Sequence, residues 1–216
     1  MSFKKINTIH LILILIISII PLLYSYNQSF YKDLVKEDGI IEYLTAIFLF
    51  LSSIVLFISF LKIKKYHSIF NFGLFLSVIV LFFGFGEEIS WGQRIFNIES
   101  PAFFNNNNLQ GETNIHNLMI DGVKLNKWIF TYGSVLFFTF YFFITPLLYI
   151  KGIIPKSLLN KFSFVVPKYF QSLLFLFSTI IINLFDYNKI SELWECSFAV
   201  TIFFVCLSPS NKTDFD

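Results

Sequence analysis

Two adjacent carboxylates, Glu87 and Glu88, follow a long apolar segment in the string GEEISWGQRIF. A carboxylate at an apolar boundary needs a proton, a metal ion or a basic partner to offset the cost of burial. At the C-terminal end of a helix the macrodipole also opposes its charge. Because ionisable groups near membrane depth are usually functional, these two glutamates are the first candidates for catalysis.

Arg94 is the single arginine among 16 basic residues, and it lies in the same string. If one helix continues through the string, four side chains share a face by i, i+3, i+4 and i+7 spacing: Glu87, Ser90, Trp91 and Arg94. A guanidinium fork suits a carboxylate or a phosphate. Arg94 therefore either holds a substrate or neutralises Glu87 or Glu88 in a structural ion pair.

A second cluster is the string NLQGETNIHN, residues 108–117. Glu112 and His116 are four residues apart and would face the same way on a helix. This spacing can supply two metal ligands or an acid/base pair. We therefore predict that Glu112 and His116 are catalytic residues as well.

A third cluster is the string SELWECS, where Glu192 and Glu195 lie one helical turn apart. Helical bundles build metal sites from carboxylates on different helices. We therefore predict a divalent metal site, of a metal the sequence does not identify, with these ligands: Glu42, Glu88, His116 and Glu195. The predicted catalytic residues are Glu87, Glu88, Arg94, Glu112 and His116.

The elements that must position these residues are membrane helices. Hydrophobic residues make up 56% of the chain and charged residues only 14%, against about 25% charge in soluble domains. Six apolar segments have lengths near the roughly 17–25 residues that span a bilayer, at about 8–25, 41–61, 68–86, 128–149, 169–185 and 192–207. We expect an all-α integral membrane bundle of six helices, with residues 1–216 forming one transmembrane domain.

The connection between the third and fourth segments, residues 87–127, is too long for a simple turn. It is predicted to be an extracytoplasmic, interfacial loop with one short helix ending before Pro101 and a second around 112–119.

The loop charges predict orientation. With the N-terminus inside, ten Lys and Arg lie on the inner side and six on the outer side, so both termini are expected in the cytoplasm. Under this topology, twelve of the 14 acids lie at the outer face: Asp33, Glu37, Asp38, Glu42, Glu87, Glu88, Glu99, Glu112, Asp121, Asp186, Glu192 and Glu195. A net charge of +2 gives no reason to expect a nucleic-acid partner.

The strings GEEISWGQRIF, NLQGETNIHN and ELWE resemble a family of small bacterial multi-pass membrane proteins, and the resemblance covers most of residues 37–200. The resemblance implies a location in the bacterial cell (inner) membrane and implies no activity. The chain departs from the CAAX-protease-like intramembrane family, because Arg94 stands two residues too far from Glu88 for a Glu-Glu-x-x-x-Arg motif.

Three functions follow from these patterns. The first is a hydrolase or transferase acting on a lipid or lipid-linked substrate, with Glu88 or His116 as general base and Arg94 holding a phosphate or carboxylate. The second is a structural or assembly subunit of a membrane complex, in which the polar motifs lock helices together. The third is a proton- or ion-coupled transporter, which predicts carboxylates deep within several spans.

Overall fold

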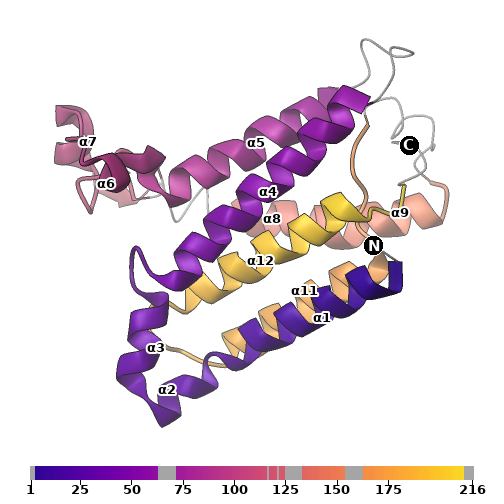
Figure 1. Cartoon of the computed structure of the whole chain (residues 1–216), viewed down its shortest axis with the longest axis horizontal. Coiled ribbons are helices and arrows are strands. Elements are labelled where there is room, and N and C mark those ends of the chain that lie inside the picture. Colours follow the sequence, from indigo (N-terminus) through magenta and orange to yellow (C-terminus); the bar gives the residue numbers. More distant parts are fainter. Residues whose placement is uncertain are drawn as a thin grey trace.

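The structure is a computed structural model that describes residues 3–62, 72–115, 117–120, 122–124, 133–153 and 163–211 (Figure 1). Most of these residues are helical, and the one short sheet is an antiparallel pair of two-residue strands. The expected all-α fold is therefore confirmed.

The first half of the described chain contains these helices: α1 (Phe3–Ile19), α2 (Leu22–Tyr26), α3 (Gln28–Val35), α4 (Ile40–Lys62), α5 (Phe72–Glu88), the 3-10 turn η1 (Ser90–Gly92), α6 (Gln93–Phe96) and α7 (Ala102–Asn107). The second half contains β1 (Met119–Ile120), β2 (Val123–Lys124), α8 (Ser134–Phe138), the π-helical turn η3 (Thr139–Ile144), α9 (Thr145–Ile150), α11 (Tyr169–Asn183) and α12 (Ile190–Leu207).

Helix α12 is the central helix of the bundle and packs against α1, α4 and α11. It contributes buried side chains to both hydrophobic clusters of the core. Small residues such as Ser197 and Ala199 are fully buried on it, which lets neighbouring helices approach closely. The Ser197 hydroxyl lies 2.5 Å from that of Ser178 on α11.

The two ends of the bundle differ in chemistry. At one end, the His10 ring on α1 stacks on Phe204 of α12 with centroids 4.6 Å apart, and the Gln171 amide of α11 donates to the Phe204 carbonyl at 2.9 Å. The helices α2, α3, α6 and α7 lie at the opposite end (Figure 1). We call this second end the polar end, because the starts of α4 and α12 and the three sequence clusters meet there.

Three stretches are long and apolar enough to cross a membrane: Lys4–Tyr26, Gln28–Lys62 and Ile190–Leu207. A fourth is formed if Phe72–Glu88 and Ser90–Phe96, which meet at an angle of 66°, are counted as one broken span. Large apolar side chains, including Ile19, Phe57 and Val80, are exposed on the outer faces of these helices. The chain is thus suited to association with a membrane.

The expectation of six spans is only partly met within the described residues. The stretches Val135–Ile150 and Tyr169–Asn183 are apolar but shorter than 18 residues. At 1.5 Å per residue, the 15 residues of α11 extend about 22 Å, less than the ~30 Å of a hydrocarbon core. Parts of the third and fourth expected spans, 68–71 and 128–132, lie outside the described residues.

Because the two ends of the bundle are expected on opposite sides of the membrane, cysteines introduced at each end should differ in their accessibility to a reagent outside the cell. If the lysine distribution sets the orientation, a cysteine replacing the exposed Asn106 at the polar end reacts in intact cells with a membrane-impermeant maleimide. A cysteine replacing the exposed Lys62, at the other end, reacts only after permeabilisation. The native Cys196 and Cys206 are buried and provide a low background. The reverse labelling pattern would show that the termini lie outside.

Candidate functional site

A cavity of about 490 Å³ lies at the polar end of the bundle. Its walls come from α4, α5, α12 and the loops around them, and they carry seven glutamates: Glu37, Glu42, Glu87, Glu88, Glu112, Glu192 and Glu195. The other polar lining residues are Lys189, Ser191 and four amides, Gln110, Asn114, Asn117 and Asn188. The structure thus brings residues of all three sequence clusters to one cavity.

The chain breaks sharply after α5, and the expected continuous helix through GEEISWGQRIF is wrong. Ser90, Trp91 and Gly92 have φ values of 46°, 55° and 76°. These three successive residues in the left-handed region bend the chain, so that the helical segments before and after the break meet at 66°. For the non-glycine residues this conformation costs on the order of 1–3 kcal/mol each, and such strain tends to occur at functional sites.

The break is stabilised by Trp91, whose indole N–H donates to Glu87 Oε1 at 2.9 Å. The other oxygen of Glu87 accepts from the Ile115 backbone N–H at 2.6 Å. With 7% of its surface exposed, Glu87 joins the end of α5 to the loop that carries the second cluster. The tryptophan, which the sequence also places at headgroup level, here has a specific polar partner.

Glu112 is the second carboxylate held by the loops, and only 6% of its surface is exposed. It accepts hydrogen bonds from the Ser90 hydroxyl and, at 3.0 Å, from the Asn114 amide, and it forms an ion pair with Arg94. Asn108 supports this arrangement by donating to the side-chain and backbone oxygens of Asn114, both at 2.9 Å.

Arg94 forms its ion pairs with Glu112 and with Asp38, which precedes α4. The expected structural partners were Glu87 or Glu88, whereas the ion pairs of Arg94 among the described residues are with other acids. The guanidinium therefore connects the turn before α4 to the loop after α5. Its contacts favour a positioning role over contact with a substrate.

The neighbouring Gln93 was not among the residues expected at the site, yet it also holds the loop. Its carbonyl oxygen accepts from the Thr113 backbone N–H at 2.7 Å, and its amide donates to the Ser100 hydroxyl at 2.6 Å. Asn108 and Asn114 were missed in the same way. The only signal in the sequence was that these amides lie within the two motif strings.

Glu42 and Glu37 each have a local partner. Glu42 lies in the first turn of α4, and its Oε2 accepts from the Asp38 backbone N–H at 2.6 Å. Glu37 accepts from the Gln110 amide and from Lys189 Nζ, the latter at 2.5 Å.

Glu88 and Glu195 differ from these four carboxylates. Across the described part of the chain, no N–H or O–H donates to either side chain, although both are half-buried on the cavity wall. Glu88 on α5 is also close enough to Glu195 and Glu192 on α12 for their charges to interact. Among the described residues, no ion pair or hydrogen bond neutralises Glu88 or Glu195.

The helix expected around 112–119 is absent from the structure as far as it is described. Residues 111–115 form turns, and β1 pairs with β2 through Met119 with Lys124 and Ile120 with Val123. Glycine and asparagine in the string favour turns over a helix. His116 lies outside the described residues, so its predicted catalytic and metal-binding roles stay predictions.

Three of the four predicted metal ligands, Glu42, Glu88 and Glu195, line the same cavity. Within the described ranges, however, no three His, Cys, Asp or Glu side chains are grouped closely enough to hold a metal ion. Since the fourth predicted ligand, His116, is outside those ranges, the metal site stays a prediction.

No protein-family model, curated protein or solved structure matches this chain.

The close contact between Gly86 and Trp91 leads to a test of the loop. A Cβ atom at Gly86 would lie 2.8 Å from the Trp91 ring, whereas one at Gly84 would lie 3.4 Å from Leu49, an ordinary contact. We expect Gly86→Ala to lower the unfolding free energy in detergent by about 1–3 kcal/mol. The control Gly84→Ala should leave it unchanged or raise it by up to about 1 kcal/mol, because alanine favours a helix. Equal melting temperatures for the two variants would show that Trp91 does not pack on Gly86.

Proposed function

We propose that this chain is a membrane-embedded hydrolase or transferase acting on a lipid or lipid-linked substrate. The observation that carries the proposal is the pair Glu88 and Glu195, two half-buried carboxylates on different helices that line one cavity without a hydrogen-bond donor in the described structure. Gathering like charges at an apolar boundary opposes folding. Such arrangements are retained mainly where the groups react.

The proposed chemistry is acid/base catalysis. Two carboxylates that cannot both ionise share one proton, and the pair then supplies one acid and one base. Glu88 is the proposed general base and Glu195 the acid that protonates the leaving group. Proton transfer by a positioned group typically accelerates a reaction by about 10²–10⁴-fold. His116 remains an alternative base, and a divalent metal on the free carboxylates remains part of the proposal.

The other predicted catalytic residues receive a supporting role in this proposal. Glu87, Arg94 and Glu112 each engage a partner from another segment. Groups that orient a reactive pair contribute through geometry, since small displacements of catalytic groups cost large factors in rate. These three residues keep the loop in place over the cavity, and Glu88 and Glu195 face it.

The location favours a substrate that enters from the bilayer. The cavity is built at the ends of α4, α5 and α12, which carry exposed apolar side chains along their length. We propose that six helices cross the cytoplasmic (inner) membrane of a bacterium, that α11 and the α8–α9 stretch are two of them, and that both termini are cytoplasmic. The cavity then faces the extracytoplasmic side.

The proposal is tested by neutralising each member of the pair. In a strain lacking the gene, lipid species processed by the enzyme should accumulate, as measured by mass spectrometry of extracted lipids. The wild-type chain should reverse the accumulation, whereas Glu88→Gln and Glu195→Gln should not, because the rate falls by about 10²-fold or more. The matched control is Glu99→Gln, an exposed acid outside the cavity, which should restore the profile. An unaltered lipid profile after deletion, or full restoration by both glutamine variants, would contradict the enzyme.

The hydrogen-bonded loop favours a second candidate, a structural subunit whose polar end locks helices together. A comparison of Arg94→Lys with Glu88→Gln distinguishes this structural subunit from an enzyme. Lysine cannot reproduce two ion pairs in fixed directions, so the unfolding free energy in detergent should fall by about 1–2 kcal/mol. For an enzyme, Glu88→Gln abolishes function at a melting temperature equal to or above that of the wild type, because it removes a charge that opposes folding. For a structural subunit, loss of function should follow loss of stability in both variants.

A transporter ranks below these two, because the described carboxylates of the bundle are gathered at one end. Proton or cation flux into proteoliposomes that Glu195→Gln abolishes would reverse this ranking.

A further inference from the structure

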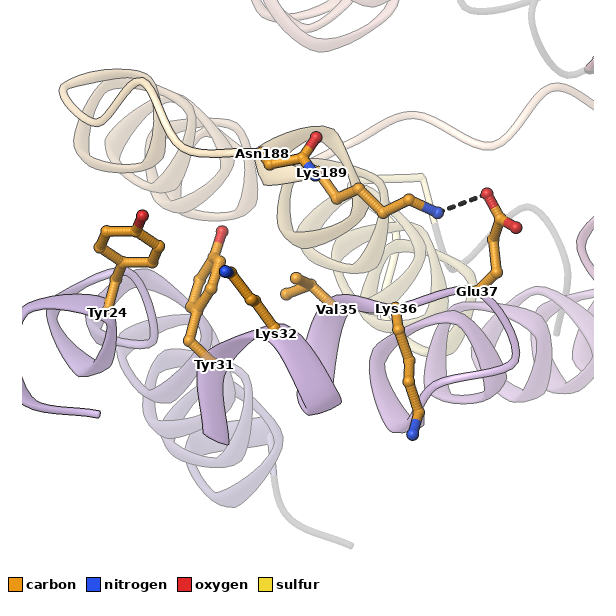
Figure 2. Close-up of a pocket in the computed structure, with 8 residues that line it drawn as sticks. All are labelled: Tyr24, Tyr31, Lys32, Val35, Lys36, Glu37, Asn188 and Lys189. Atoms are coloured by element: carbon orange, nitrogen blue, oxygen red, sulfur yellow. Dashed lines mark hydrogen bonds and ion pairs between the residues drawn. The ribbon is translucent and has the colours of Figure 1, made fainter. Parts of the chain in front are cut away.

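Figure 2 shows a second cavity, of about 420 Å³. It adjoins the cavity lined by seven glutamates, which we call the glutamate cavity. One wall is formed by α2, α3 and the residues that follow α3, and the other by the connection between α11 and α12. The two cavities share three lining residues, Glu37, Asn188 and Lys189. The ion pair of Glu37 and Lys189 therefore belongs to both.

The lining of the second cavity carries mainly positive charge, whereas that of the first carries mainly negative charge. Three lysines and one glutamate line it, and that glutamate is already paired with Lys189. Lys36 forms an exposed ion pair with Asp33 and points away from the rest of the lining in Figure 2. Lys32 remains, and no carboxylate of the described residues lies within ion-pair distance of its amine.

The Tyr31 hydroxyl also lacks a partner. Its side chain is fully buried, and no described residue forms a hydrogen bond with the hydroxyl oxygen. A buried hydroxyl without a partner costs about 1–3 kcal/mol in proteins. In Figure 2 the hydroxyls of Tyr24 and Tyr31 and the amine of Lys32 all point toward the α11–α12 connection that carries Asn188. Several donors thus converge on one space.

The aromatic rings keep these donors in place. Tyr24 stacks on Tyr187 with ring centroids 4.1 Å apart and meets the edge of Tyr31 at 5.4 Å. Tyrosines in this arrangement are typical of the membrane interface, where the ring is in apolar surroundings and the hydroxyl in polar ones.

We propose that the second cavity binds the phosphate group of an anionic ligand, held by Lys32 and by the hydroxyls of Tyr31 and Tyr24. Lysine binds phosphate as a point charge, hydroxyls donate to its oxygens, and basic pockets at the ends of membrane helices bind lipid headgroups. The phosphate supplies the acceptor that the Tyr31 hydroxyl lacks. The site binds phosphate whether or not the glutamate cavity is catalytic.

The test measures binding of two probes to the full chain in dodecyl maltoside by isothermal titration calorimetry. The first probe is inorganic phosphate, and the second is phosphatidylglycerol in mixed micelles, with phosphatidylcholine as the zwitterionic comparison. Saturable binding of phosphatidylglycerol alone identifies a lipid headgroup, and binding of both anions identifies a site for phosphate in general. Either result supports the proposal.

Substitutions then assign the residues. Lys32→Gln should weaken binding of the anion about tenfold or more, and Tyr31→Phe, which removes only the hydroxyl, about three- to tenfold. The matched control Lys36→Gln removes the same charge from the same cavity wall at an amine that points away, and it should change affinity less than twofold. Melting temperatures equal to the wild type show that the variants are folded.

Three results would overturn the proposal. The first is that neither anion binds saturably. The second is an equal loss of anion affinity in Lys32→Gln and Lys36→Gln. The third is that phosphatidylcholine binds as tightly as phosphatidylglycerol. Should Lys32→Gln fail to fold, the isosteric Tyr31→Phe decides alone, and an affinity equal to the wild type would count against the site.

Discussion

The polar end depends on one bridging cation, Arg94, between two acids from separate segments. Asp38 precedes α4 and Glu112 lies in the loop after α7. A planar guanidinium can bind two carboxylates in fixed directions, which a lysine amine does not reproduce. Because Glu112 is almost completely buried, the ion pair also offsets the cost of removing its charge from water. The position of the loop follows from this bridge.

Around that bridge the carboxylates divide into two kinds. Glu87 and Glu112 receive donors from the left-handed turn and from the backbone of the next loop, so their charges are used to hold the chain. Glu88 and Glu195 receive none from the described residues and line the cavity. The two neighbours Glu87 and Glu88 thus have different surroundings, since consecutive residues at a helix end point in different directions.

The fold class could be predicted from composition and apolar segment length, because lipid demands helices whose backbone groups are satisfied within one segment. The gathering of Glu42, Glu88 and Glu195 followed from topology, since their positions all fall at the same ends of alternating helices. The path of the chain after Glu88 could not be predicted. Helical spacing favours continuation there, and the left-handed turn is stabilised by contacts with residues more than twenty positions away.

The partners of Arg94 were beyond sequence reasoning for a similar reason. Proximity in the string pointed to Glu87 and Glu88, whereas the ion pair with Asp38 joins residues 56 positions apart. Local spacing predicts which side chains share a face of one helix, but it carries no information on which loop folds back onto that face. The number of spans did not follow from apolar segment length either, because the segment expected at 169–185 forms α11, a helix too short for a full crossing.

If the second cavity binds an anion as proposed, the shared pair of Glu37 and Lys189 couples the two cavities electrostatically. An anion in the second cavity attracts Lys189 away from Glu37, and the released carboxylate adds to the negative charge that already lines the first cavity. A cation or proton bound among the glutamates has the reverse effect and frees Lys189 for the anion. Occupancy of one cavity therefore favours an oppositely charged group in the other, and by linkage the effect is reciprocal. A phosphorylated amphiphile that presents its phosphate to the tyrosines would place the atoms next to that phosphate near the pair of Glu37 and Lys189, which also lines the cavity of Glu42 and Glu195.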